Sequence, residues 1–378
     1  MATATAAAAV VVEVAAAASP EPLVKLAEIP GRGRALVATR AIKPGEVLLS
    51  ESPLLLYPAT IASNYCSQCY RSLSAGGHRC LAGPPPSPWL SETIGRLRSH
   101  VGEPDLFSQA CFLAAAYDLA AFSPSSFSLF LSLQGSHTDP SASVLHALLS
   151  SLAPSPLPPG FSPDLTAALL AKDKLNAFGL MEPFREEDSG ERRVRAYGIY
   201  PKASFFNHDC LPNACRFDYV DGDGENNTAI VVRAIHEIPE GREVCLSYFP
   251  VNWNYKERQA TLLQDYGFKC ECDRCQVEKN WKDEDEDQEE EIVESMDEED
   301  GMEGMEEDNG GVGGEDDGDF PHAYFFIRYV CDRENCGGTL APLPPAPGGT
   351  TSSVMECNVC GRCKTDDGFG GDASMLDE

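Results

Sequence analysis

The sequence lacks the features that would place it in several classes of protein. Beyond its alanine-rich start it has no run of about 20 strongly apolar residues, the length that spans a bilayer as a helix. No Lys or Arg precedes Lys25, and Glu13 interrupts the alanines, so the start resembles neither a secretory signal nor an organelle transit peptide. We predict a disordered alanine-rich tail over residues 1–22 and no membrane association.

Positive charge is also scarce. The 378 residues include 29 Lys and Arg against 59 Asp and Glu, which gives a net charge of -30. Residues 283–319 alone carry 21 acidic side chains and no basic one, so the rest of the chain is only mildly acidic. Because no broad basic face is indicated, direct binding to nucleic acid is not expected.

The acidic run lies within residues 281–320, a stretch with too few apolar side chains to fold, and we predict a disordered linker there. One interpretation is a solvated spacer between metal-binding segments. A second is that the carboxylates attract Lys- and Arg-rich substrate tails, or fold back over a basic patch and compete with them. Salt would screen either effect over about 10 Å at 0.1 M.

Cysteine, in contrast, is abundant at 15 residues. Secreted disulfide frameworks belong to short chains behind a signal peptide, and this chain shows neither property. We therefore expect a reducing compartment, nuclear and/or cytoplasmic, where closely spaced cysteines usually bind zinc.

The chemically richest stretch is YPKASFFNHDCLPNAC, from Tyr200 to Cys215. Upstream, GRGR at residues 31–34 opens a strand-like run, and downstream EVCLSYF at residues 243–249 is followed by YGFKCECDRC at residues 266–275. An isolated NH dipeptide or GxG turn is usually an ordinary loop. The specific signal is the combination of all four motifs in this order.

That order, GxG, NHxCxPN, a strand ending in Tyr, then YxFxCxC, resembles the SET-domain protein lysine methyltransferases. More narrowly it resembles the SMYD-like (SET and MYND) branch and its plant ASH-related relatives, in which an insertion splits the SET domain. Matching segments cover residues 23–57 and 173–275. The resemblance implies a mainly β SET fold split by a largely α-helical insertion, an α+β fold with a zinc-bound post-SET segment.

The resemblance also implies S-adenosyl-L-methionine as cofactor and a role for each matching residue. Tyr248 is implied as the catalytic residue, and Ser204, Phe206 and Tyr266 as lining the substrate channel. A strand-end tyrosine is more often structural, and Asn176 also fits a helix C-cap. The residues implied in cofactor binding are Arg32, Gly33, Arg34, Asn176, Asn207, His208, Tyr248 and Phe268.

Three groups of cysteines are candidates for Zn²⁺. By the resemblance, Cys210 joins Cys270, Cys272 and Cys275 on one ion. From spacing alone, Cys331, Cys336, Cys357 and Cys360 form two turn-like pairs typical of a zinc ribbon, with Cys363 as a spare or competing ligand. Cys66, Cys69, His78 and Cys80 resemble the first half of a MYND zinc finger, or are an incidental loop. Cys215 and Cys245, flanked by apolar residues, are predicted to be buried free thiols.

Two distant segments share a strand, turn, strand phrase. RAI followed by PGEV at residues 40–47 returns as RAI followed by PEGREV at residues 233–244. We therefore predict that the N-terminal strands and those of residues 228–249 build one β-rich domain. Between them, helices are predicted over residues 106–119, 141–152 and 164–178, with a Pro-rich linker at 153–163.

The predicted organisation follows from these boundaries. It comprises the tail 1–22, the first SET part 23–57, the insertion 58–172 with its degenerate MYND-like segment, the second SET part 173–250, the post-SET zinc segment 251–280, the acidic linker 281–320, the zinc-ribbon-like segment 321–365 and a tail 366–378.

The sequence thus predicts a monomeric protein-lysine N-methyltransferase whose substrate is a protein lysine, in a histone or another protein. A first alternative is a catalytically weak SET protein that acts as a chromatin or protein adaptor through its zinc segments. A second, a purely zinc-based nucleic-acid binder, is disfavoured because no basic stripe lies near residues 331–363.

Overall fold

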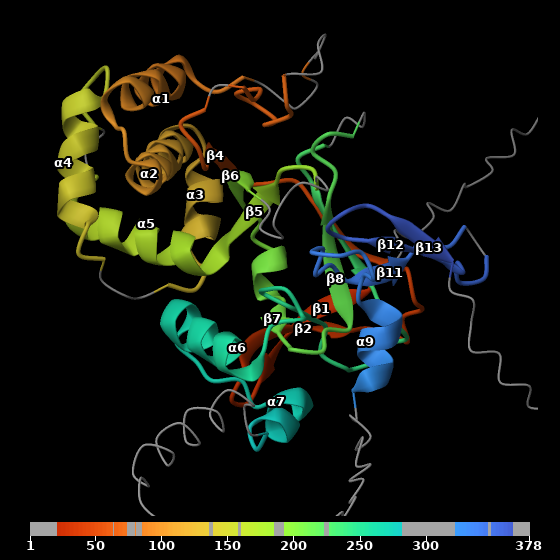
Figure 1. The fold of residues 1–378 in the computed structure, drawn as a ribbon. Helices are drawn as coiled ribbons and strands as arrows, with labels where there is room; N and C mark the ends of the chain where they lie inside the picture. Colours follow the sequence, from red (N-terminus) through yellow and green to blue (C-terminus); the bar gives the residue numbers. More distant parts are fainter. Residues whose placement is uncertain are drawn as a thin grey trace, which may run out of the picture.

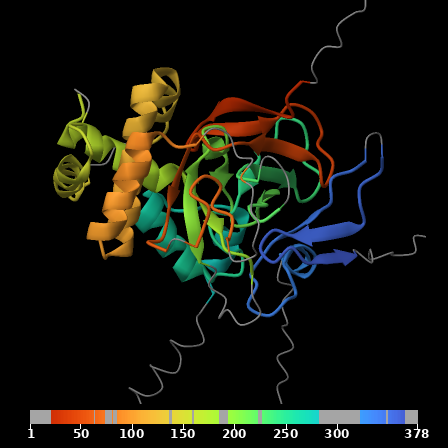
Figure 2. The same cartoon turned by 90° about the horizontal axis from the view of Figure 1, so that it is seen from above.

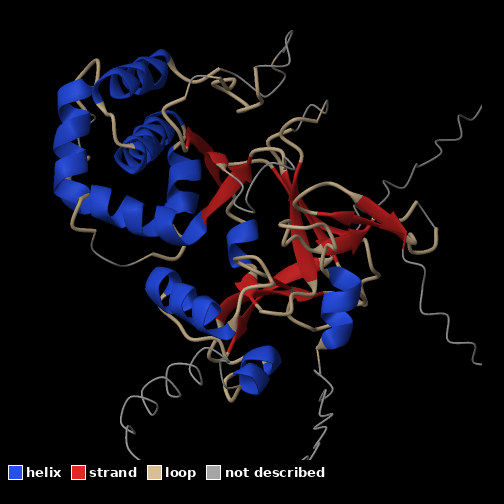
Figure 3. Cartoon of the chain, in the orientation of Figure 1, coloured by secondary structure: helices blue, strands red, loops and turns tan. Residues whose placement is uncertain are grey.

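The computed structural model describes residues 21–62, 64–73, 80, 85–135, 139–157, 160–184, 193–222, 227–281, 322–346 and 349–365. Residues 1–20 of the predicted N-terminal tail, the acidic run at 283–319, His78 and residues 366–378 lie outside these ranges. In Figures 1 and 3 a group of helices stands beside a group of short, twisted sheets.

Most strands belong to small antiparallel sheets. The first is a hairpin of β1 (Val24–Ile29) and β2 (Gly33–Ala38), in which Ile29 pairs with Gly33. The others have the strand orders β3-β9-β8 and β4-β6-β5, while β7 and β10 form a short parallel pair. Their bounds are β3 (Val47–Glu51), β4 (Leu55–Pro58), β5 (Ala177–Met181), β6 (Val194–Ile199), β7 (Asn207–His208), β8 (Ala214–Asp218), β9 (Ile230–Ala234) and β10 (Cys245–Leu246).

The two strand, turn, strand phrases pair with each other. Strand β3 is antiparallel to β9, with Ser50 opposite Val231, and isolated bridges join Val37 to Glu243 and Ile42 to Ile238. Apolar residues of both segments share one core with Leu36, Val232 and Val244 buried in it. The prediction that these distant segments build one β-rich domain is therefore confirmed.

The described residues between β4 and β5 form five helices, and Figure 2 shows the helices packed at one side of the sheets. Helix α2 runs through their centre and is buried nearly all round from Phe107 to Tyr117, which explains its alanine-rich sequence. Pro begins four of the five helices at the first turn, where its missing N–H costs nothing. The bounds are α1 (Pro88–His100), α2 (Pro104–Phe122), α3 (Pro124–Leu131), α4 (Ala142–Leu152) and α5 (Pro163–Asn176).

Two predicted elements end earlier than expected. Helix α5 ends at Asn176 rather than residue 178, because the next residues pair with β6 as strand β5. The strand expected over residues 243–249 is reduced to β10, Cys245–Leu246. After Leu246 the backbone makes hydrogen bonds with side chains instead of with a neighbouring strand. The Tyr248 N–H donates to His208 Nδ1, and the Phe249 carbonyl accepts from the Ser247 hydroxyl.

The C-terminal part of the described chain is a small sheet and a helix packed against the strands. It contains α9 (Ala323–Tyr329) and the antiparallel strands β11 (Leu340–Pro342), β12 (Val354–Cys357) and β13 (Cys363–Thr365). Figure 1 shows this unit, drawn in blue, beside β8. Within the described ranges, none of the helices combines the length and the apolar character needed to cross a membrane.

Candidate active site

Two cavities of similar size approach the same few side chains from different directions. We call the first, of about 610 Å³, the arginine-lined cavity, because Arg32 and Arg34 lie on its wall. We call the second, of about 570 Å³, the aromatic cavity, because Phe249 and Trp253 lie on its wall. Four residues line both cavities: Leu175, Ser204, Tyr248 and Tyr266. A group held in one cavity is therefore close to a group held in the other at this shared boundary.

The arginine-lined cavity is built around the turn between β1 and β2. Gly31 and Gly33 adopt positive φ of 77° and 73°, a conformation that strains other residues, and so let the turn present Arg32 inward. Arg32 forms a salt bridge from Nε to Glu243 at 2.7 Å and donates from Nη2 to the His208 carbonyl at 2.9 Å. The turn is thereby fixed to the β7–β10 pair.

Asn207 shares the anchor that holds Arg32. Its amide nitrogen donates to the other carboxylate oxygen of Glu243 at 2.8 Å. One half-buried carboxylate thus orients both a guanidinium and a carboxamide at the rim of the arginine-lined cavity. This pairing gives the cavity fixed hydrogen-bonding groups of the kind that orient a polar ligand.

His208 is held as a neutral imidazole. Its Nδ1 accepts the Tyr248 N–H at 3.2 Å, so the ring proton lies on Nε2, which is 3.3 Å from the Cys210 sulfur. Burial lowers the pKa of His208 to about 3. The ring therefore ties the Tyr248 backbone to the Cys210 thiol rather than carrying charge.

Tyr248 lies at the boundary between the cavities. Its hydroxyl donates to the Phe206 carbonyl at 3.0 Å, and its ring centroid is 4.7 Å from that of Tyr266. Burial raises the pKa of the Tyr248 phenol, so it stays protonated at physiological pH. Because its hydrogen is donated to Phe206, the phenol oxygen keeps its lone pairs for a group that enters between the cavities.

A change of helix type positions Tyr266. Helix α6 (Tyr255–Thr261) begins with a capping box of Asn254 and Glu257 and continues as one π-helical turn, η2 (Leu262–Tyr266). Gly267 then ends the turn in the left-handed conformation at φ 77°. The wider turn places Tyr266 on both cavities, and the chain that follows lines the arginine-lined cavity from Gly267 to Glu271.

The aromatic cavity lies where two edge strands approach each other. Strands β5 and β8 are each at the edge of a three-stranded sheet, and residues of both line the cavity. Arg216 of β8 bridges them by donating to the Gly179 carbonyl at 2.9 Å. On another wall, Phe249 and Trp253 stack with ring centroids 5.1 Å apart and planes 7° from parallel. An elongated, partly apolar ligand fits this shape better than a small ion.

The first cysteine group holds the segment after Tyr266 against this site. The sulfur atoms of Cys210, Cys270, Cys272 and Cys275 all lie within 4.8 Å of one another. Hydrogen bonds from Cys210 and Cys270 lower the pKa of the Cys272 thiol to about 6, while the donating Cys210 has its pKa raised. Four thiols gathered around one point fit a tetrahedral Zn²⁺ site.

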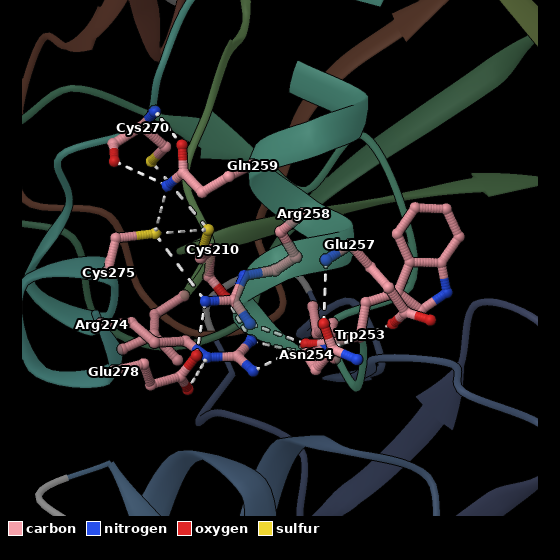
Figure 4. Close-up of polar contacts among 12 residues, drawn as sticks. Cys210, Trp253, Asn254, Glu257, Arg258, Gln259, Cys270, Arg274, Cys275 and Glu278 are labelled. Atoms are coloured by element: carbon pink, nitrogen blue, oxygen red, sulfur yellow. Dashed lines mark hydrogen bonds and ion pairs between the residues drawn. The ribbon is translucent and has the colours of Figure 1, made fainter. Parts of the chain in front are cut away.

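Buried polar groups surround the first cysteine group, as Figure 4 shows. Gln259 donates to the Cys275 sulfur at 3.2 Å, and Arg258 lies 3.8 Å from the same sulfur. Glu278 of α7 (Asp273–Glu278) accepts from Arg258 at 2.6 Å and from Arg274 at 2.5 Å, and all three side chains are buried. The Arg258 guanidinium beside Cys275 favours its thiolate, the form that binds a metal.

The second group consists of Cys331, Cys336, Cys357 and Cys360, whose sulfur atoms also lie within 4.8 Å of one another. A hydrogen bond from Cys357 lowers the pKa of the Cys336 thiol to about 5. The Val359 N–H points at the Cys357 sulfur at 3.4 Å, as in metal-binding knuckles. This group also fits a tetrahedral site, and Cys363 is exposed and outside it.

The MYND-like segment is less complete within the described chain. Cys66, Cys69 and Cys80 come together as three candidate ligands, whereas His78 lies outside the described residues. Cys215 and Cys245 are buried thiols that belong to none of these groups.

The structure places the other predicted site residues as follows. Arg32, Arg34, Asn176, Asn207, His208, Tyr248 and Phe268 line the arginine-lined cavity, and Phe206 lines the aromatic one. Gly33 shapes the turn without lining either cavity. The Asn176 amide donates to the carbonyls of Lys172 and Gln134, at 2.7 and 2.8 Å, so it also fastens the end of α5.

Several residues at the site were not predicted from the sequence. Glu243 orients Arg32 and Asn207, and Leu133 and Gln134, after α3, line the arginine-lined cavity from within the insertion. Phe249 and Trp253 could have been suspected only from two aromatic residues close behind Tyr248. The others depend on contacts between segments far apart in sequence.

Comparison with known proteins gives one family match and several relatives. The model of the family described as "SET domain" matches residues 33–249. Histone-lysine N-methyltransferase ASHR2 of Arabidopsis thaliana is 53% identical over 393 residues, which cover 92% of this chain and 97% of that protein. Histone-lysine N-methyltransferase SMYD3 of Mus musculus is 33% identical over 124 residues, which cover 33% of this chain and 25% of that protein.

Among solved structures, Rubisco LSMT bound to AdoMet is similar at 15% identity and a TM-score of 0.37. The likeness covers 67% of this chain and 53% of that one.

Proposed function

The chain belongs to the SET-domain family, and on that premise we propose that it transfers methyl groups from S-adenosylmethionine to lysine side chains of proteins. The observation that carries the proposal is the boundary shared by the two cavities. The arginine-lined cavity holds the cofactor, the aromatic cavity holds the substrate segment, and Tyr248 lies where they meet. Both of these relatives are named histone-lysine N-methyltransferases, which supports lysine as the target and histones as a substrate class.

The geometry suits a direct displacement. The bound cofactor supplies a methyl group on a positively charged sulfur. The lysine nitrogen forms a bond to that methyl carbon as the carbon–sulfur bond breaks, the electron pair stays on sulfur, and the amine proton passes to solvent. This step needs in-line positioning more than acid or base chemistry, and two cavities that open onto one narrow boundary provide it.

The boundary residues prepare the amine. Leu175, Tyr248 and Tyr266 surround it with apolar and aromatic surface, which disfavours the charged ammonium and lowers the pKa of the entering lysine. The Tyr248 oxygen, having donated its hydrogen to Phe206, accepts an N–H of the neutral amine and orients its lone pair.

The remaining parts of the proposal concern metals, partners and location. Zn²⁺ bound by Cys210, Cys270, Cys272 and Cys275 would hold the segment carrying Tyr266 and Phe268 against His208, and a second Zn²⁺ would close the C-terminal knuckles. The protein would act as a monomer, in the nucleus and/or cytoplasm, on chromatin or other protein substrates. Direct contact with nucleic acid is not part of the proposal.

The test is cofactor binding followed by label transfer. Calorimetry with S-adenosylhomocysteine should show one site per chain, and incubation with methyl-labelled S-adenosylmethionine and a histone mixture should label histone bands. Cofactor binding without label in histones or in a wider protein extract would instead favour the adaptor alternative. Absence of cofactor binding would contradict the proposal itself.

A further inference from the structure

The C-terminal unit is fixed to the SET strands through specific polar contacts. The Asn358 amide donates to the Arg216 carbonyl of β8 at 3.2 Å, while its oxygen accepts the Thr339 N–H at 2.8 Å. Glu356 of β12 pairs with the buried Arg233 of β9 at 2.8 Å. The second knuckle, residues 357–360, therefore has a defined position on the edge of the β3-β9-β8 sheet.

Apolar packing and close backbone approach fix the same unit further. Phe217 and Val251 of the SET part share a buried core with Leu340 and Met355 of the C-terminal unit. The first knuckle, residues 331–338, comes so close to the loop after Tyr248 that a Cβ added at Gly337 would lie 3.0 Å from the Asn252 side chain. Gly337 also has a φ of 59°, a backbone conformation that glycine adopts without strain and that other residues rarely adopt. This packing is that of a single body rather than of a tethered module.

The knuckles face the aromatic cavity. Gly337, Thr339, Asn358 and Val359 line it, together with the stacked Phe249 and Trp253. The charged residues on its wall are Arg216 and Asp218, and the Arg216 guanidinium is directed to the Gly179 carbonyl and the Phe178 ring. Around the knuckles the wall carries the apolar side chains of Val359, Pro250 and Val251 beside the polar side chains of Thr339 and Asn358. A substrate segment in this cavity would meet the Val359 side chain of the C-terminal unit.

We propose that the C-terminal four-cysteine unit is part of the substrate site, and that Val359 with Phe249 and Trp253 forms an apolar subsite for a side chain next to the target lysine. This inference rests on the proposed function for the identity of the substrate, a protein segment with a lysine. On this inference the second knuckle determines which amino acids are accepted beside that lysine. It takes no part in cofactor binding or in the transfer step.

The test compares two variants that add the same charge in different places. Val359→Glu puts a carboxylate in the subsite, whereas Thr365→Glu puts one on the exposed strand β13, away from either cavity. Each protein, with S-adenosylhomocysteine, is used to retain members of a lysine-centred degenerate peptide library, and the retained pool is sequenced. The wild type and Thr365→Glu should enrich apolar residues at one position beside the lysine. Val359→Glu should lose that enrichment and favour Lys or Arg there.

Steady-state kinetics on the best wild-type peptide give the second readout. Val359→Glu should raise KM by about tenfold, the effect of about 1.4 kcal/mol, with kcat little changed. Zinc content and melting temperature show whether the variant is folded. If Val359→Glu does not fold, Val359→Leu is used instead, because it keeps the wall apolar but narrows the subsite. Val359→Leu should shift the enrichment beside the lysine to a smaller apolar residue. Identical pools and KM values for folded variants and the wild type would overturn the subsite.

The retention arm separates this inference from the proposed function. A wild type that methylates no peptide, yet retains an apolar-flanked pool that Val359→Glu alters, would contradict the activity and support the subsite. A wild type that methylates peptides but shows the same pool as Val359→Glu would support the activity and contradict the subsite.

Discussion

Glu243 forms a 2.7 Å salt bridge with Arg32 and so joins the β1–β2 turn to the strand that leads into Tyr248. The same carboxylate accepts from Asn207, which makes it the common support of two side chains on the arginine-lined cavity. Arg32 lies in that turn and Asn207 in the two-residue strand β7, so one carboxylate orients side chains from two separate segments. We therefore expect Glu243 to act through these residues on cofactor affinity.

Glu243→Gln should weaken S-adenosylhomocysteine binding by about tenfold, or about 1.4 kcal/mol, because the neutral amide cannot hold the guanidinium as strongly. Glu240→Gln, a change at an exposed position in the same segment, is the matched control and should bind normally. Calorimetry measures both. Equal affinities for the two variants would show that the Arg32–Glu243 pair does not shape the cofactor site.

Cys210→Ser should lower zinc content by one ion per chain, because three thiols from the CECDRC segment cannot complete a tetrahedral site. Elemental analysis of the purified protein should give at least two zinc ions in the wild type. Cys215→Ser, which removes a buried thiol outside the clusters, is the control and should keep the full content. An unchanged count in Cys210→Ser would refute the shared site.

Glu278→Ala should lower the free energy of unfolding by about 3 kcal/mol or more, because it leaves Arg258 and Arg274 buried without their shared carboxylate. The loss should be visible in denaturant unfolding at constant zinc. Glu237→Ala removes an exposed carboxylate and should change stability little. Similar midpoints for the two variants would mean that the Arg258–Glu278–Arg274 group contributes nothing net.

Asp173 provides a pH-dependent test. Burial raises its pKa to about 7, although it accepts a hydrogen bond from the Tyr57 hydroxyl at 2.5 Å. An unfolded aspartate ionises near pH about 4, so the folded state binds the extra proton between these values. The contribution of Asp173 to stability is therefore fully present below about pH 4 and is lost as pH rises towards 7.

Asp173→Asn removes this dependence while keeping an acceptor for Tyr57. The melting temperature of the variant minus that of the wild type should therefore be larger at pH 8 than at pH 5. Asp164→Asn, an exposed change on the same helix, should shift the melting temperature equally at both values. A wild type and Asp173→Asn that respond identically to pH would contradict the buried-carboxyl assignment.

The parts of the site that could be predicted are those in which chemistry is local in sequence. The NHDC and CECDRC motifs contain the four cysteines of the first group. In the structure the Cys210 and Cys275 sulfur atoms, 65 residues apart in sequence, lie 3.5 Å from each other. The repeated RAI phrase predicted that the N-terminal strands and those of residues 228–249 build one β-rich domain, in which β3 pairs with β9. The resemblance to the SET family supplied the first prediction, and a repeated residue pattern supplied the second.

The parts that could not be predicted depend on the packing of distant segments. Nothing near Glu243 in sequence shows that its carboxylate meets Arg32, and nothing in the 357–360 knuckle shows that Asn358 binds β8. Helix α5 ends before Ala177 only because β6 offers a pairing partner, which outweighs local helix preference. The role of residues 133 and 134 likewise follows from where the insertion packs.

The central claim is that Tyr248, at the boundary of the two cavities, acts in methyl transfer to lysine. The most direct measurement is mass spectrometry of methyl-lysine formed from labelled S-adenosylmethionine on a histone mixture, comparing the wild type with Tyr248→Phe. Tyr248→Phe should retain S-adenosylhomocysteine affinity and most of its stability, since one hydroxyl hydrogen bond is worth about 1 kcal/mol, but lose most of the label. Equal labelling by both proteins, or labelled residues other than lysine, would contradict the account.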